Sequence, residues 1–413
     1  MNRYLAVLVG LALVLGAGVG PAAGSHEIVI GLQCDRTGAT QVVGVNLCPG
    51  YHDYVRLVNS KGGVEGHKIK AIEIDHEYKV PQGVEAYERH KKEGAVFISL
   101  YGTPHTYALT QKLTEDKIPG TSPGFGRADA TDGTRYPYIF PVAASYWSQG
   151  AASVKFAKDQ LGGSLKGKKI AYLFFDNPAG REPIPVLEDL ARLEGFQLKT
   201  FAVPPPGVEM GAQVLDIGQR FRADFVIAHL FGRSPSVSIK ELKRVGYPLG
   251  KVVSFVWGAA EADVEAAGGF GVAEGYNAMQ YAGVGSDFPV ISEIREMYRK
   301  EGKEPPKEMA STVYYNRGVF WAAIAIEAVR NAVKAKPDGR VTGADVKVGL
   351  EKVKGFTLGG LLPPLEITPL DHEGGGWVQI WQARGGKFVK ATDWYKAYTD
   401  VVAKHIKEAG TKK

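Results

Sequence analysis

The sequence contains little of what marks several common classes of protein. Only two cysteines, Cys34 and Cys48, occur among 413 residues, which excludes a disulfide-dense scaffold and a cysteine-rich metal cluster. No long apolar run follows the N-terminal segment, so no later membrane-spanning helix is predicted. The 50 Lys and Arg residues only slightly exceed the 44 Asp and Glu residues, and they form no run of five. No nucleic-acid partner is predicted, since proteins bind nucleic acids through clustered basic residues.

The composition is that of an ordinary globular protein. Hydrophobic residues make up 45% of the chain and charged residues 23%, which excludes a disordered or fibrous protein. At roughly 100–200 residues per domain, the length suggests two or three compact units. The 52 glycines and 23 prolines indicate many tight connections between short elements.

The N-terminus has the pattern of a secretory signal over residues 1–24. Arg3 supplies the positive start, residues 4–20 are apolar or glycine, and Ala22 and Gly24 place small side chains at −3 and −1 of a cleavage site. The alternative is a membrane anchor, which fits less well because a span needs about 20 apolar residues. We therefore expect a soluble protein exported to the periplasm, with its signal peptide removed near Gly24.

Cys34 and Cys48 are predicted to form a disulfide, because an even pair of cysteines in an exported chain is most simply oxidised. The bond would close a loop of about 15 residues and stabilise the fold by about 3 kcal/mol in the chain-entropy account. A metal site that also used His52 is the alternative, but the close ligand spacing of structural zinc is missing. No metal and no cofactor are predicted.

Short apolar runs alternate with amphipathic helical stretches from residue 27 onward. This rhythm predicts an α/β architecture in which helices cover both faces of parallel sheets. The rhythm occurs twice, so two similar lobes in tandem are expected. Glycine-rich dinucleotide fingerprints are missing, since Gly269 and Gly271 lack a third glycine and a preceding strand. The predicted strands occupy residues 28–32, 69–74, 95–100 and 119–123 in the first lobe, and 169–175, 196–201, 224–230 and 252–257 in the second.

The chain is expected to cross between the lobes near residues 140–146, 276–284 and 362–370. Several such crossings form a hinge, and two lobes joined by a hinge enclose a cleft. The resulting division is a signal peptide (1–24), an N-terminal lobe (25–142 plus 280–363), a C-terminal lobe (143–279 plus 364–400) and a solvated tail (401–413).

Several short motifs in a fixed order resemble those of one protein family. They are Thr37-Gly38 after the first strand, the turn at residues 59–66, Gly102-Thr103 after the third strand, Ser122-Pro123 after the fourth, and Ser148-Gln149-Gly150 after the first crossing. With these motifs the chain resembles the type I periplasmic substrate-binding proteins of ABC importers, and within them the leucine/isoleucine/valine-binding branch.

The resemblance implies two Rossmann-like doubly wound lobes joined by a multi-strand hinge, and solute capture rather than catalysis. A small ligand, either an amino acid or an organic acid, would bind between the lobes, which would close on it. The closed form would then be recognised by an ABC permease in the inner membrane. The protein would act as a monomer without a cofactor. The same fold also serves sensory receptors, and this alternative stays open.

In the N-terminal lobe, the resemblance places the ligand carboxylate at Thr103, which follows the third strand and precedes a helix. Free backbone N–H groups at such a helix start favour an anion, although Thr103 could equally be a simple helix cap. Arg36 is either a carboxylate ligand or a solvated surface residue. The further contacts expected from this lobe are Thr37, Gln41, Tyr101, Gly102, Ser122, Phe125 and Gly126.

In the C-terminal lobe, the expected contacts are Tyr146, Asn177, Phe231, Trp257 and Glu261. Amino-acid binders of this branch carry an acid near the end of the strand that matches residues 252–257 here, and this acid holds the ligand ammonium. The matching position in this chain is Ala259, with Glu261 two residues later. Burying an unpaired ammonium is very costly. Three ligand classes therefore stay open: a branched-chain or related amino acid, an aromatic or other organic acid without an amino group, and an amide.

Residues 120–124 also match G-x-S-x-G, the pattern around hydrolase nucleophiles. That chemistry needs Ser122 at a strand-to-helix turn and a histidine base late in the chain. Pro123 follows the serine directly and no helical pattern comes after it, while His372 and His405 have no supporting context. No enzyme activity is predicted.

Overall fold

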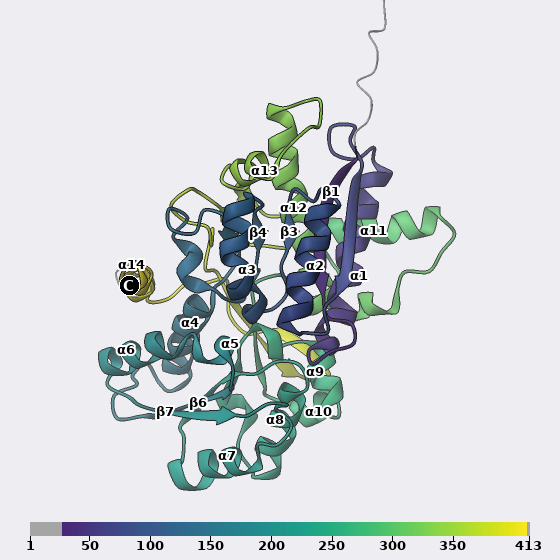
Figure 1. The fold of residues 1–413 in the computed structure, drawn as a ribbon. Helices are drawn as coiled ribbons and strands as arrows, with labels where there is room; N and C mark the ends of the chain where they lie inside the picture. Colours follow the sequence, from purple (N-terminus) through teal and green to yellow (C-terminus); the bar gives the residue numbers. More distant parts are fainter. Residues whose placement is uncertain (1–26, 411–413) are drawn as a thin grey trace, which may run out of the picture.

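The strands of the protein form two main sheets, which lie in separate lobes (Figure 1). This computed structural model describes residues 27–410. The signal peptide expected at residues 1–24 lies outside the described residues. Within residues 27–410, no helix combines the length and the apolar character that crossing a membrane requires.

The N-terminal lobe is built on a five-stranded parallel sheet in the order β2-β1-β3-β4-β5. β1 (Ile28–Cys34) is buried along nearly its whole length, as expected for an interior strand of a parallel sheet covered on both faces. The other strands are β2 (Ile69–Asp75), β3 (Ile98–Ser99), β4 (Gly120–Thr121) and β5 (Ile139–Phe140). β3 and β4 are shorter than the sequence predicts, because only two residues of each pair with the neighbouring strand.

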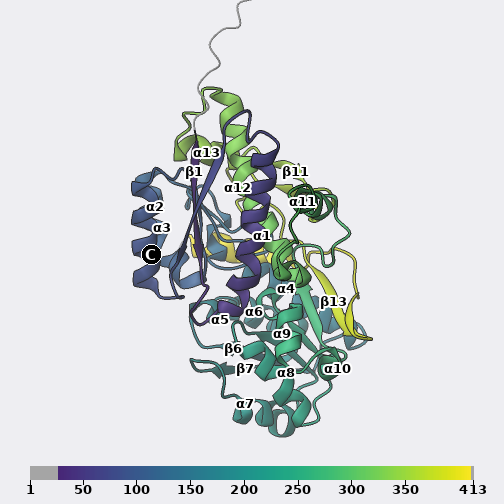
Figure 2. The same ribbon diagram turned by 90° about the vertical axis from the view of Figure 1, so that its right-hand side faces the viewer.

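Helices cover both faces of this sheet (Figure 2). α1 and α12 lie side by side on one face, while α2 and α3 lie on the other. α11 packs against α1, and α13 packs against α12. Their bounds are α1 (Gln41–Ser60), α2 (Val80–Lys92), α3 (Thr103–Asp116), α11 (Pro289–Lys300), α12 (Thr312–Ala335) and α13 (Gly343–Leu350).

The contact between α1 and α12 depends on two glycines. A Cβ atom on Gly50 of α1 would lie 2.2 Å from the carbonyl oxygen of Tyr315, and one on Gly318 of α12 would lie 1.9 Å from that of Leu47. The two backbones therefore approach more closely than any other residue would allow at these positions. This approach fixes α12, which carries side chains into the space between the lobes.

The C-terminal lobe is built on a seven-stranded sheet in the order β14-β13-β10-β9-β8-β6-β7. Five neighbouring strands, β10, β9, β8, β6 and β7, run parallel. β13 and β14 add an antiparallel hairpin beside β10 at the edge of the sheet. The strand predicted over residues 169–175 is confirmed as β6. The bounds are β6 (Lys169–Phe175), β7 (Gln197–Val203), β8 (Phe225–His229), β9 (Val252–Ser254), β10 (Asn277–Gln280), β13 (Gln379–Arg384) and β14 (Lys387–Lys390).

Short helices fill the connections of this lobe. After β7, the short helix α7 is followed by a π-helical turn over Asp216–Phe221. The helices are α4 (Tyr146–Gln160), α5 (Pro178–Arg181), α6 (Ile184–Glu194), α7 (Gly211–Leu215), α8 (Ser234–Arg244), α9 (Glu261–Ala266) and α10 (Phe270–Ala273).

The chain crosses between the lobes three times. The crossings follow β5, β10 and the small ladder of β11 (Lys354–Phe356) and β12 (Leu365–Glu366). Backbone bonds join them: the N–H of Ala143 donates to the carbonyl of Glu373 (3.0 Å), and that of Gly283 to Leu361 (2.7 Å). The predicted fold class, two doubly wound α/β lobes on a multi-strand hinge, is confirmed.

The prediction of a solvated tail over residues 401–413 is wrong for its described part. α14 (Thr399–Ala409) packs against α4 and α6. Val402 is buried there, and the His405 imidazole lies 2.9 Å from the carboxylate of Asp189. The helix docks because Val402 and Ile406, one turn apart, share one face, which is apolar.

Candidate functional site

The main candidate site is a pocket between the two lobes, lined by residues of both. It lies beyond the carboxyl ends of strands from both sheets, where ligands of open α/β sheets bind. Seven of the residues singled out from the sequence line it: Tyr101, Gly102, Thr103, Phe125, Tyr146, Phe231 and Trp257. Eight further residues complete the lining: Thr40, Val43, Leu47, Tyr78, Pro123, Tyr281, Arg317 and Trp321.

The N-terminal lobe presents its part of the pocket through the β3–α3 connection. Gly102 has φ +94°, a conformation that favours glycine, and a Cβ atom there would lie 2.7 Å from the ring of Tyr78. Thr103 is the first residue of α3. Its hydroxyl oxygen accepts a hydrogen bond from the backbone N–H of Gly126 (3.3 Å), which ties two loops of this lobe together. The local chain path thus places Tyr101 and Thr103 at the same edge.

The C-terminal lobe contributes two aromatic residues that follow its central strands. Phe231 comes after β8, and its ring lies 6.3 Å from the ring of Tyr78 in the other lobe. Trp257 comes after β9, and its indole N–H donates to the carbonyl of Gly124 across the cleft (2.9 Å). The structure therefore shows the two lobes in contact over the pocket.

The lining is dominated by aromatic rings. Eight of the fifteen lining residues are Phe, Tyr or Trp. Burial raises the pKa of all four lining tyrosines, Tyr78, Tyr101, Tyr146 and Tyr281, so their hydroxyls stay neutral. Among the described residues, no Asp or Glu side chain lines this pocket. The pocket suits an apolar or aromatic body, with a few hydroxyl groups to orient it.

Arg317 is the one lining residue of the described chain that carries a full charge. It lies on α12, is fully buried, and was not singled out from the sequence. The signal that could have found it is its position, because it is the only charged residue in the otherwise uncharged stretch 312–326. A charge kept in such a stretch needs a reason other than solubility.

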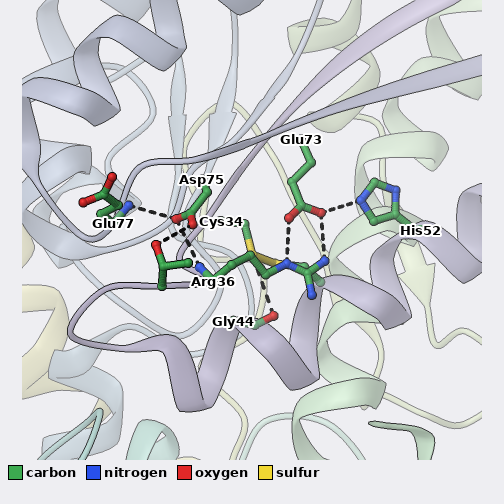
Figure 3. Close-up of polar contacts among 9 residues, drawn as sticks. Cys34, Arg36, Gly44, His52, Glu73, Asp75 and Glu77 are labelled. Atoms are coloured by element: carbon green, nitrogen blue, oxygen red, sulfur yellow. Dashed lines mark hydrogen bonds and ion pairs between the residues drawn. A yellow bond between two sulfur atoms is a disulfide. The ribbon is translucent and has the colours of Figure 1, made fainter. Parts of the chain in front are cut away.

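Two residues considered from the sequence, Arg36 and Thr37, lie in the loop after β1, and their side chains bond acids of β2 (Figure 3). Arg36 forms a two-point ion pair with Glu73, with atoms 2.7 and 2.9 Å apart. Thr37 donates its hydroxyl to Asp75 (2.7 Å), and Gln41 begins α1 with an exposed side chain. These three residues do not border the pocket.

Glu73 explains why Arg36 is held there. Burial acts to raise the pKa of this carboxyl, but hydrogen bonds from His52 and Arg36 outweigh it and lower the pKa to about 2. The carboxylate is therefore fully charged at neutral pH and keeps the guanidinium beside it. In this structure Arg36 is partly buried against Glu73 and does not line the pocket.

The predicted disulfide between Cys34 and Cys48 is present and ties the end of β1 to α1 (Figure 3). Its sulfur atoms bond each other, so they are not offered to a metal, and His52 contacts Glu73 instead. The bond holds the start of α1, from which Thr40, Val43 and Leu47 reach the pocket. A pinned loop lowers the ordering cost of binding.

Glu261 and Asn177 also lie outside the pocket lining. The Glu261 carboxylate accepts hydrogen bonds from the hydroxyl of Thr312 (2.5 Å) and the N–H of Val313 (3.1 Å), so it caps the start of α12. Asn177 caps α5 by accepting from the N–H of Gly180 (3.1 Å). Both side chains serve helix starts, a role that the strand-end positions in the sequence did not reveal.

Ser122 and Gly126 are the other two residues predicted from the sequence as ligand contacts that do not line the pocket. Ser122 is buried, and its hydroxyl has no hydrogen-bond partner in residues 27–410, so no histidine activates it. His372, one candidate base, bonds the carbonyl of Ile139 (2.8 Å). The G-x-S-x-G match therefore lacks the nucleophile–base contact that it requires. Gly126 makes room for the neighbouring lobe, since a Cβ atom there would lie 2.2 Å from the Glu182 carboxylate.

Glu182 joins the lobes beside the pocket. It lies between α5 and α6, and its carboxyl accepts the N–H of Ala128 (2.7 Å) and the hydroxyl of Tyr107 (3.2 Å), both in the N-terminal lobe. Burial raises the pKa of Glu182 to about 8. The bond from Ala128 acts against this shift and nearby Asp129 acts with it. Because its pKa is raised where the lobes meet, contact between the lobes at Glu182 is most favourable when this carboxyl is protonated.

We expect ligand affinity to fall by about tenfold or more between pH 6 and pH 8. A pKa that is higher in the closed form than in the open form favours closure at low pH, and this contribution is lost as the pH rises from about 4.5 through about 8. The measurement is the dissociation constant at several pH values for the wild type and for Glu182→Gln. Glutamine keeps one oxygen that can accept the N–H of Ala128, and its amide N–H can donate to the Tyr107 hydroxyl instead. It does not titrate, so the variant should show a flatter profile. Equal profiles would contradict this role of Glu182.

Comparison with known proteins agrees with the fold. A family model described as periplasmic binding protein matches residues 27–387. A solved structure from the Pseudomonas fluorescens group, described as an ABC transporter permease, is 32% identical with a TM-score of 0.84, covering 94% of this chain and 97% of that one. No curated protein sequence gave a significant match.

Two more distant structures share the fold. A branched-chain amino acid ABC transporter protein from Thermus thermophilus with bound valine is 23% identical with a TM-score of 0.80, covering 92% of this chain and 99% of that one. A fatty acid ABC transporter substrate-binding protein from Thermomonospora curvata is 18% identical with a TM-score of 0.77, covering 92% of this chain and 94% of that one.

Proposed function

The chain belongs to the periplasmic binding protein family, and we propose that it is the exported solute receptor of an ABC import system whose ligand is a small apolar or aromatic acid without an amino group. The observation that carries this proposal is the composition of the interlobe pocket. Eight aromatic side chains line it, and within the described residues no carboxylate does.

The lining disfavours an amino acid because of the ammonium group. A buried ammonium needs an opposite charge close by, and leaving it unpaired is very costly. The only fully charged side chain lining the pocket in the described chain is the cation of Arg317, which repels an ammonium. Glu261, the acid offered by the sequence, is bonded to the start of α12. Of the ligand classes left open by the sequence, the amine-free acid fits best.

Capture would proceed by hinge closure. Both lobes supply lining residues, so a ligand gains its full set of contacts only when the lobes come together, and this difference in contacts drives the closure. The permease in the inner membrane would then recognise the closed surface, and the protein would act as a monomer. The relatives support the choice of ligand class to this extent: the same fold is described for a protein with bound valine and for a fatty acid transporter protein.

The test is a thermal-shift comparison of compounds that differ only in the amino group. The mature protein is first unfolded and refolded to remove any bound compound. It is then mixed with leucine or 4-methylpentanoate, and with phenylalanine or 3-phenylpropionate. A ligand at about 100 times its dissociation constant stabilises the protein by about 2.7 kcal/mol. We expect the amine-free member of at least one pair to give the larger shift. Larger shifts with leucine and phenylalanine would overturn the proposal.

A further inference from the structure

Arg317 is a buried cation whose partners are all neutral. Its two terminal nitrogens donate to the carbonyls of Val256 and Met279 and to the side-chain oxygen of Gln280. Its Nε–H has no hydrogen-bond partner within residues 27–410. A guanidinium offers five N–H donors in a rigid fork, and an unmatched buried donor costs free energy. The side chain therefore has donor capacity left, and it borders the pocket.

The protein supplies no carboxylate in direct contact with this charge. No ion pair within 4.0 Å joins Arg317 to any acid of the described chain. The acids that influence it are Glu261 and Asp263 of α9. Both have other partners: Glu261 bonds Thr312 and Val313, and Asp263 bonds the N–H of Ala260 (3.0 Å) and the hydroxyl of Tyr314 (2.8 Å). Burial also raises the pKa of both carboxyls. That of Asp263 rises to about 7, so the charge of Asp263 near neutral pH is incomplete.

Three aromatic rings fix the guanidinium in place. Its carbon lies 4.8 Å from the ring centre of Tyr281, 5.2 Å from that of Trp257 and 5.7 Å from that of Tyr314. The negative faces of such rings stabilise a cation without neutralising it. Tyr281 and Trp257 also line the pocket. The arginine is therefore held, still charged, at the edge of the space that a ligand would occupy.

We propose that Arg317 binds the carboxylate of the ligand, so that the acid group lies at the α12 side of the pocket against Tyr281 and Trp257. This inference rests on the proposed function and adds the position and the partner of the acid group. It differs from the placement that the family resemblance implies, at Thr103 on the start of α3. The Thr103 hydroxyl is hydrogen-bonded to the N–H of Gly126 and to the side chain of Tyr146, whereas the Nε–H of Arg317 has no hydrogen-bond partner within residues 27–410.

The experiment compares acids with their uncharged amides on the refolded wild type. The probes are 4-methylpentanoate and 4-methylpentanamide, 3-phenylpropionate and 3-phenylpropionamide, and benzoate and benzamide, with dissociation constants measured by calorimetry. A hydrogen bond to a charged group is worth on the order of tenfold to hundredfold in affinity. We expect at least one acid to bind more tightly than its amide by this factor. Equal binding of acid and amide, or no binding of any acid, would overturn the proposal.

Two variants locate the group that recognises the charge. Arg317→Gln should bind acid and amide alike, whereas Thr103→Val should keep the preference for the acid. Arg317→Lys keeps the charge but not the fork, so it should keep part of the preference. Circular dichroism and the unfolding temperature establish that each variant folds, and the wild-type comparison stands without them. Loss of the preference in Thr103→Val but not in Arg317→Gln would place the acid group at α3 and refute the proposal. The proposed function fails separately, if the amino acids bind more tightly than the matching acids.

Discussion

Reducing the Cys34–Cys48 disulfide is expected to lower the free energy of unfolding by about 3 kcal/mol. The two cysteines are 14 residues apart in the sequence, and opening a loop of this length returns chain entropy to the unfolded state. Both are fully buried, between the end of β1 and the middle of α1. The measurement is the urea midpoint of the ligand-free protein with and without reductant.

The control is the double variant Cys34→Ala, Cys48→Ala, which has no disulfide to lose. Its urea midpoint should not respond to reductant, and it should lie near or below that of the reduced wild type. An unchanged midpoint for the wild type, in a sample whose two thiols are shown to be free, would contradict the expected contribution. Because the disulfide also holds the segment that carries Thr40 and Val43 to the pocket, reduction should weaken ligand binding as well.

Gly232→Ala is expected to weaken ligand binding by about tenfold or more, because it prevents the lobes from reaching their arrangement in this structure. Gly232 follows β8 in the C-terminal lobe, and a Cβ atom on it would lie 2.5 Å from the carbonyl oxygen of Ala39 in the N-terminal lobe. Each 1.4 kcal/mol lost from the closed form costs about one factor of ten in affinity. The measurement is the dissociation constant of the acid that binds the wild type most tightly.

Gly246→Ala is the matched control. Gly246 lies in the same lobe and also has a positive φ, +76° against +65° for Gly232, but nothing lies within 4 Å of a Cβ atom built on it. Both variants bear the conformational cost of alanine in the left-handed region, about 1–2 kcal/mol, and should lose similar stability. Only Gly232→Ala should lose affinity. Equal affinities of the two variants would mean that this close approach of the lobes is not part of binding.

The fold could be predicted from the sequence because its signals are local. β6 is a run of seven residues, Lys169–Phe175, whose interior is buried in the sheet, and the glycine at 195 ends α6 with φ +72°. The parallel pairing within each sheet follows from the alternation of strands and helices. α14 was missed because its apolar stripe is short and lies among lysines, so its pattern resembled a solvated tail.

The candidate site could be predicted only where residues follow strand ends. Tyr101, Phe231 and Trp257 are of this kind, and all three line the pocket. Tyr281 comes from a crossing and Arg317 from the second turn of α12. Only the packing of the lobes brings them to the ligand space. Glu261 was considered for its charge and its position after a strand. Its carboxylate instead accepts hydrogen bonds from Thr312 and Val313 at the start of α12. No pattern within one segment reports such a competition between partners.

Small-angle X-ray scattering of the refolded protein tests the central claim most directly, because it measures the closure of the two lobes on a ligand. The radius of gyration is compared without ligand and with saturating 4-methylpentanoate, 3-phenylpropionate, leucine or phenylalanine. We expect at least one of the two amine-free acids to decrease the radius of gyration and the two amino acids to leave it unchanged. A decrease with leucine or phenylalanine and none with the acids would contradict the proposal that the receptor closes on an acid without an amino group.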